Sequence, residues 1–174
     1  VSLDQTERDR LRNLTLKSSD RVVSEGDVVE VVGYMTGLPH RPKVSGPESV
    51  NCRLTGMDNN DVHIPLARHP EDTEFEGIVV EMIPQGRSTG WTTRKLRRIT
   101  REGRPVLVRG QLFYDNPHVV NDDPDDVKAG QPKRFSLWEV HPVTEFQVCM
   151  TASKKCDPTK VKEPQWKRLE KVKD

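Results

Sequence analysis

The sequence predicts a mostly β chain that folds as an OB-type five-stranded Greek-key barrel, with one additional strand and one short helix before the last two strands. Short segments rich in β-branched residues recur between turn signals, and one segment alone carries helix-capping signals. With 174 residues, of which 33% are hydrophobic, the chain has room for one domain with polar arms.

Composition divides the chain into three regions. Residues 1–20 place widely spaced leucines among charged residues, which predicts an N-terminal arm. Residues 21–150 hold the strand candidates and are expected to form the barrel domain. Residues 151–174 are rich in lysine and contain two prolines, so we expect a basic C-terminal tail in which Trp166 is the only large apolar anchor.

The first half of the domain contains four strand candidates. Asp27–Met35 has the alternation of a first strand. Val50–Leu54 and Asp61–Leu66 flank Met57–Asn60, whose Asp and Asn residues suit a tight hairpin connection. Glu76–Ile83 then reads as the additional strand.

The best helix candidate is Trp91–Arg101. Thr92 can cap its start, and Trp91 and Leu96 occupy the two positions of a hydrophobic staple. Gly103 supplies a C-terminal stop. Two long strands follow, Val106–Tyr114 and Phe135–Val148, separated by an acidic loop.

Two segments carry a resemblance to known proteins. Gly110–His118 and Leu137–Pro142 are similar to segments of uncharacterised bacterial proteins with OB-like domains. The resemblance extends from Asp27 to Val148 and implies an OB-like fold. It implies no activity, cofactor or site residue at any position.

Charge gives no global reason to expect a polyanion or membrane partner, because the formal net charge is +1. Locally, Arg87–Arg104 holds seven bases and one acid, whereas Asp115–Asp126 holds five acids and no base. These stretches are typical of solvated surface, with a functional patch as the alternative. No apolar run approaches the roughly 20 residues of a membrane span.

The three cysteines are Cys52, Cys149 and Cys156. In an exported protein, Cys149 and Cys156 can close a short disulfide, and Cys52 is expected to be a buried thiol. The sequence begins at Val1, which is compatible with a removed secretion signal and a periplasmic or secreted location.

Two histidine and carboxylate pairs are the strongest chemical signal. Asp61 and His63 project from one face of their strand, and Glu139 and His141 repeat the arrangement on the last strand. Together they can hold one divalent metal ion with an open position, although such pairs are also typical of hydrogen-bonded barrel-mouth residues. Three further polar residues lie at or just after strand ends, where loops present side chains to ligands: Glu81, Asp115 and His118.

Other catalytic signatures are missing from the sequence. It contains no Gly-x-Ser-x-Gly elbow, no Cys-x-x-Cys pair and no P-loop. Serine-triad, cysteine-zinc and P-loop nucleotide sites are therefore not predicted.

Ligand binding is the broader interpretation, because OB barrels generally receive single-stranded nucleic acid or oligosaccharide on the face of their second and third strands. Here Arg53 and His63 would lie on that face, with His40, Arg41 and Lys43 in the first long loop. We therefore favour a non-enzymatic, cofactor-free binding module for a protein, peptide, glycan or single-stranded nucleic acid. The alternative is a metal-dependent, phosphodiesterase-like hydrolase with Asp61, His63, Glu139 and His141 as ligands. The oligomeric state stays open.

Overall fold

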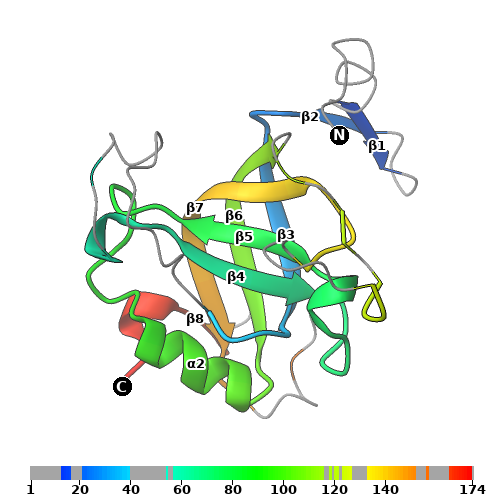
Figure 1. Cartoon of the computed structure of the whole chain (residues 1–174). Coiled ribbons are helices and arrows are strands. Elements are labelled where there is room, and N and C mark those ends of the chain that lie inside the picture. The colour runs from blue at the N-terminus through cyan, green and yellow to red at the C-terminus, as the bar shows by residue number, and fades with distance from the viewer. Residues whose placement is uncertain are drawn as a thin grey trace.

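The computed structural model describes residues 13–16, 21–39, 54, 57–115, 118, 120–121, 123–126, 133–151, 156 and 165–173 (Figure 1). In chain order, its elements are β1 (Asn13–Leu16), β2 (Arg21–Ser24), β3 (Val28–Met35), η1 (Met57–Asn59), β4 (Val62–Ala67), η2 (Glu74–Glu76), β5 (Ile78–Met82), α2 (Thr93–Arg101), β6 (Pro105–Tyr114), β7 (Trp138–Cys149), β8 (Trp166–Arg168) and η4 (Leu169–Lys171). In this part of the chain, no helix has the length and apolar character that a membrane crossing requires.

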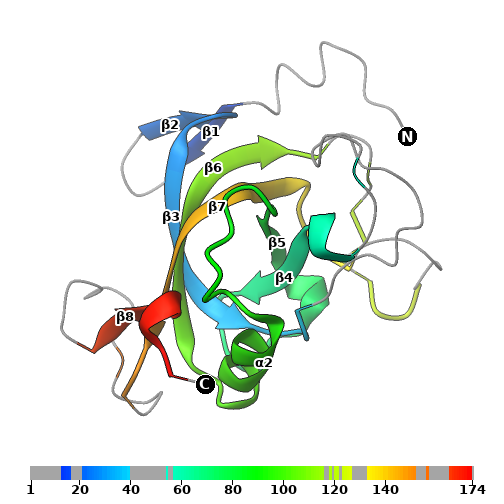
Figure 2. The same ribbon diagram turned by 90° about the vertical axis from the view of Figure 1, so that its left-hand side faces the viewer.

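Strands β3 to β7 form the predicted closed barrel. The order β5-β4-β3-β6-β7 is antiparallel throughout, and a parallel pairing of β5 with β7 closes the sheet. Figure 2 shows β3, β6 and β7 curving round β4 and β5, with α2 at one end. The OB-type barrel with one additional strand and one helix before β6 and β7 is therefore confirmed.

The identity of two strands differs from the sequence prediction. The partner of β4 is β5, which makes the segment at Ile78 the third barrel strand rather than the additional one. Residues 50–53 lie outside the described residues, and Leu54 is exposed and outside any strand. The additional strand of the barrel sheet is β8, which pairs antiparallel with the end of β7.

The segments predicted as arms also contribute structure. Residues 13–16 form β1, which pairs with β2 in a two-stranded sheet. In the predicted basic tail, Trp166, Leu169 and Val172 are buried, because β8 and η4 lie against the barrel and its helix. The described end of the chain is therefore part of the domain, and Trp166 is its anchor as expected.

The helix prediction is confirmed at both ends. Thr92 Oγ1 accepts a hydrogen bond from the Lys95 backbone N–H at 3.2 Å. Leu96 and Ile99 are fully buried in the barrel core, together with Trp91. Gly103 adopts a φ of 57°, a left-handed conformation that glycine tolerates and that ends helices.

Candidate metal centre on the outer face of the barrel

Alternation along the strands separates an apolar inside from a polar outside. Val62, Ile64, Val80 and Val140 are almost fully buried in the core. Successive side chains of a strand point to opposite faces, so their neighbours in β4, β5 and β7 lie on the outer face. Those neighbours are Asp61, His63, Glu81, Glu139 and His141, with Asp61 immediately before β4.

Strand register brings these side chains together. His63 is directly opposite Glu81 in the antiparallel pair of β4 and β5. In the parallel pair, Val80 is opposite Val140, so the next residues along each strand, Glu81 and His141, continue side by side. Gly110 allows β6 to approach β7 beside His141, since a Cβ atom there would meet the Pro142 carbonyl oxygen at 2.3 Å.

Asp61, Glu81 and His141 form a group suited to a metal ion. One ligand atom of each lies within 4.8 Å of the others. The His141 imidazole stands between the carboxylates, with Nδ1 3.4 Å from Glu81 Oε2 and Nε2 3.7 Å from Asp61 Oδ2. Two metal–ligand bonds of about 2.1 Å at a tetrahedral angle place their ligand atoms roughly 3.4 Å apart, so the three side chains would have to move closer together to bind an ion.

The group is buried yet open on one side. Asp61 is 2% exposed and Glu81 is 6% exposed. The side chains of His63 and His141 are 25% and 11% exposed, which marks the side on which the group faces solvent. Phe113 packs edge-on against the His141 ring, with 5.3 Å between the ring centroids, and so fixes the ring's orientation.

His63 orients Glu81 and favours its charged form. His63 Nε2 lies 2.8 Å from Glu81 Oε1, which leaves Oε2 on the side of His141. Burial raises the pKa of Glu81, but the hydrogen bond and charge of His63, together with the charge of His141, outweigh it and hold the pKa below its ordinary value. An ionised carboxylate is the form that ligates metals.

A second polar cluster adjoins the first and contains Glu139. The guanidinium of Arg134, which is 1% exposed, binds both Glu139 and Asp115, and His118 binds Asp115 in turn. Burial, followed by the negative charge of Glu81, raises the pKa of Glu139 to about 9. The charge and hydrogen bond of Arg134 lower this pKa but do not offset the two larger effects. This cluster anchors the connection between β6 and β7 over the outer face.

The predicted site residues separate into three sets. Asp61 and His141 are in the candidate metal group, whereas His63 and Glu139 lie beside it, on Glu81 and Arg134 respectively. The third set, His40, Arg41, Lys43 and Arg53, lies outside the described residues.

Sequence reasoning did not assign Glu81 as a ligand or Arg134 as the clamp of Asp115 and Glu139. Glu81 is the only charged residue in the apolar strand β5, and that signal is visible in the sequence. Arg134 has no such signal, because it lies in a connection without periodicity.

Comparisons with known proteins add no family to this geometry. A scan against protein-family models, a search of curated proteins and a search of solved structures find no match to the chain.

Proposed function

We propose that the domain is a metal-dependent hydrolase that holds one divalent cation with Asp61, Glu81 and His141. The observation that carries this proposal is the gathering of their three ligand atoms within 4.8 Å, in a largely buried group. Two carboxylates and one imidazole suit zinc, manganese or iron, and their two negative charges balance a divalent ion. Buried carboxylates need such compensation, because leaving water costs them much free energy.

The position of the group supports a functional ion over a purely structural one. OB barrels generally receive ligands on the face of their second and third strands. In this chain those strands are β4 and β5, and their outer face carries His63 and Glu81. A cation there would lie where an OB barrel meets its ligand.

The chemistry requires an open coordination position. Three protein ligands leave room for a water molecule, whose pKa a bound divalent ion lowers towards neutrality. The resulting hydroxide oxygen would bond to the phosphorus of a phosphodiester. The bond from phosphorus to one ester oxygen would break, and the departing alkoxide would take up a proton. The sum is the addition of one water molecule, without oxidation or reduction.

A non-enzymatic binding module is the second candidate, and the place of the cluster on the ligand-receiving face of the barrel favours it. In that case the cation, or the two histidines alone, would contact the ligand without attacking it. The two candidates differ in turnover, since only the first consumes a substrate.

The test combines metal binding with hydrolysis. Isothermal titration with Zn²⁺ and Mn²⁺ should give one equivalent bound to the wild-type chain. Asp61→Asn, Glu81→Gln and His141→Gln should each weaken this binding by more than about tenfold. Glu145→Gln is the matched control, because Glu145 is also in β7 but binds Arg168 and Gln147 instead.

Hydrolysis of bis(p-nitrophenyl) phosphate and p-nitrophenyl acetate should then follow metal occupancy across the same variants. Metal binding without turnover of either substrate would contradict the hydrolase and favour the binding module. Absence of metal binding in the wild-type chain would contradict the metal centre itself.

A further inference from the structure

Two adjoining cavities lie on another part of the domain, along β8 and η4. One has a volume of about 300 Å³ and the other about 530 Å³, and both are lined by Lys167 and Lys171. We call them together the β8 groove. Its basic lining residues are Arg98, Arg104, Lys167, Arg168, Lys171 and Lys173.

The β8 groove has a strong surplus of positive charge. Its six basic side chains face two acidic ones, Glu102 and Glu145, whereas the whole chain has a net charge of +1. Among the described residues, no ion pair joins Lys167, Lys171 or Lys173 to a carboxylate. The nearby Glu170 accepts a hydrogen bond from Trp91 Nε1 at 3.0 Å. Clustered cations in a hollow raise the local concentration of anions.

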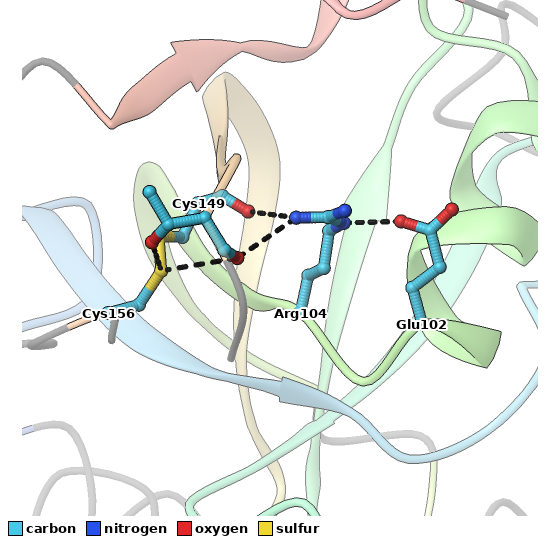
Figure 3. Close-up of a disulfide and its surroundings, with 5 residues drawn as sticks. Glu102, Arg104, Cys149 and Cys156 are labelled. Carbon is cyan, nitrogen blue, oxygen red and sulfur yellow. Dashed lines mark hydrogen bonds and ion pairs between the residues drawn. A yellow bond between two sulfur atoms is a disulfide. The ribbon is translucent and has the colours of Figure 1, made fainter. Parts of the chain in front are cut away.

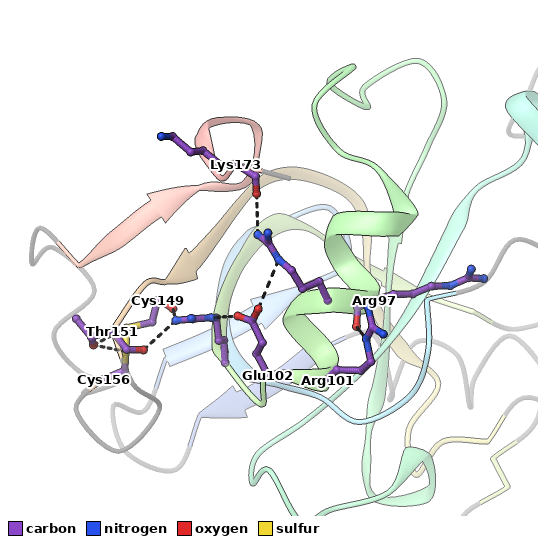
Figure 4. A network of polar contacts seen from close by, with 9 residues as sticks. Arg97, Arg101, Glu102, Cys149, Thr151, Cys156 and Lys173 are labelled. Atoms are coloured by element: carbon purple, nitrogen blue, oxygen red, sulfur yellow. Dashed lines mark hydrogen bonds and ion pairs between the residues drawn. A yellow bond between two sulfur atoms is a disulfide. The ribbon is translucent and has the colours of Figure 1, made fainter.

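Arg98 and Arg104 line the smaller cavity and hydrogen-bond to the backbone around it. Arg104 Nη1 donates to the carbonyl oxygens of Cys149 and Thr151 at 3.2 and 3.0 Å. Figure 3 shows Arg104 beside the disulfide between Cys149 and Cys156. The Lys173 carbonyl oxygen, labelled in Figure 4, accepts a hydrogen bond from Arg98 Nη2 at 2.7 Å.

Glu102 binds both of these arginines and so joins α2 to the framework. The arginines therefore hold the end of β7 and the C-terminal segment in place. Lys171 also acts on Glu170: burial raises the pKa of this carboxyl group, but the hydrogen bond from Trp91 and the charges of Arg168 and Lys171 hold the pKa below its ordinary value. Lys167 and Lys173 have no ion-pair partner among the described residues.

The wall of the larger cavity includes a buried aromatic residue. Trp166 lines it and is 7% exposed, and its Nε1–H has no acceptor among the described residues. Because the indole is buried, the groove offers no stacking surface for a base or sugar ring through Trp166.

We propose that the β8 groove binds a ligand that carries two or more phosphate groups, with Lys167 and Lys171 in contact with them. Ammonium groups suit phosphate, and two adjoining cavities extend beyond the size of one phosphate group. The ligand is recognised through its anionic groups, since the lining provides cations rather than exposed rings. Its source is either a free oligophosphate compound or the backbone of a single-stranded nucleic acid.

Titration of metal-free protein tests this proposal independently of the hydrolase. Tripolyphosphate and a fifteen-residue oligothymidylate serve as the probes at two salt concentrations. The double variant Lys167→Gln, Lys171→Gln should bind at least one probe about tenfold or more weakly than the wild type. The matched control is Arg94→Gln, Arg97→Gln, which removes the same charge from exposed positions of α2 outside the groove. Thermal melting confirms that both double variants are folded.

The two probes distinguish between the two sources of phosphate. Binding of tripolyphosphate that the groove variant alone loses assigns a free oligophosphate ligand. Binding of the oligonucleotide alone, weakening steeply with salt, assigns a nucleic-acid backbone. The proposal is overturned if the wild type binds neither probe, or if the control variant loses as much affinity as the groove variant.

Discussion

Asp61 Oδ2 and His141 Nε2 lie 3.7 Å apart, although Asp61 precedes β4 and His141 belongs to the last barrel strand. The closure of the barrel by β5 and β7 makes this approach possible, because β5 lies between the two strands and contributes Glu81. The same pairing that closes the fold thus assembles the candidate metal group. The expected consequences concern the group itself, the cluster beside it and the C-terminal disulfide.

His63→Gln should lower the affinity for Zn²⁺ by about 10- to 100-fold, because His63 orients the carboxylate of Glu81 without belonging to the metal group. Glu81→Gln, which removes a ligand, should lower it further. Isothermal titration measures both, with His69→Gln as the control at an exposed position. Equal affinity in His63→Gln and the wild type would contradict the orienting role.

Arg134→Met should reduce the free energy of unfolding by about 3–5 kcal/mol, because it leaves the buried carboxylate of Asp115 without its cation and Glu139 without its hydrogen-bond donor. Urea denaturation at neutral pH measures the change. The control is Arg94→Met at an exposed position of α2, for which we expect a change within about 0.5 kcal/mol. A loss no larger than that of the control would contradict the clamp.

The stability of the fold should fall in acid through Asp115. Burial would raise the pKa of its carboxyl group, but the hydrogen bonds from His118 and Arg134 outweigh it and hold the pKa at about 2. The ordinary value is about 3.9, so the carboxylate stabilises the fold fully above about pH 4 and loses this contribution as the pH falls towards 2.

Asp115→Asn should therefore be less stable than the wild type at pH 6, on the order of 2 kcal/mol, and should show a shallower loss between pH 4 and pH 2. Asp125→Asn, at an exposed position of the same connection, is the control and should follow the wild type. If the free energy of unfolding of Asp115→Asn and of the wild type changed with pH in the same way, this carboxyl group would not link stability to pH.

The Cys149 and Cys156 disulfide should contribute about 2–3 kcal/mol, because it closes a short loop and restricts the unfolded chain. Cys156→Ser should lose that amount in urea denaturation. Reduction should destabilise the wild type equally and leave the variant unchanged, which controls for effects of the serine. If Cys156→Ser were as stable as the oxidised wild type, this contribution would be absent.

Much of the barrel could be predicted from the sequence, because its signals are local. The alternation in β3 and β4 and the cap at Thr92 predicted these elements close to their observed bounds. The role of β5 was wrong in the sequence prediction, since pairing depends on contacts that local pattern does not specify. The sequence analysis did not predict β8, because a strand of three residues is too short to show the alternation of apolar and polar residues that identifies a strand.

The candidate site was predictable in part. Alternation placed Asp61 with His63 and Glu139 with His141, yet it gave no means of telling which of the four side chains join Glu81 in the metal group and which lie beside it. That choice depends on the parallel register of β5 and β7 and on Arg134, which binds Glu139. Long-range register and a connection of irregular structure were therefore the missing information.

The most direct measurement is a zinc-edge anomalous difference map from crystals of the protein grown with Zn²⁺. We expect one strong peak on the outer face of β4 and β5, about 2.0–2.2 Å from an oxygen of Asp61, an oxygen of Glu81 and a nitrogen of His141. The peak should be missing from crystals of Glu81→Gln. A map without density between these three side chains, or with zinc bound only elsewhere, would contradict the metal centre.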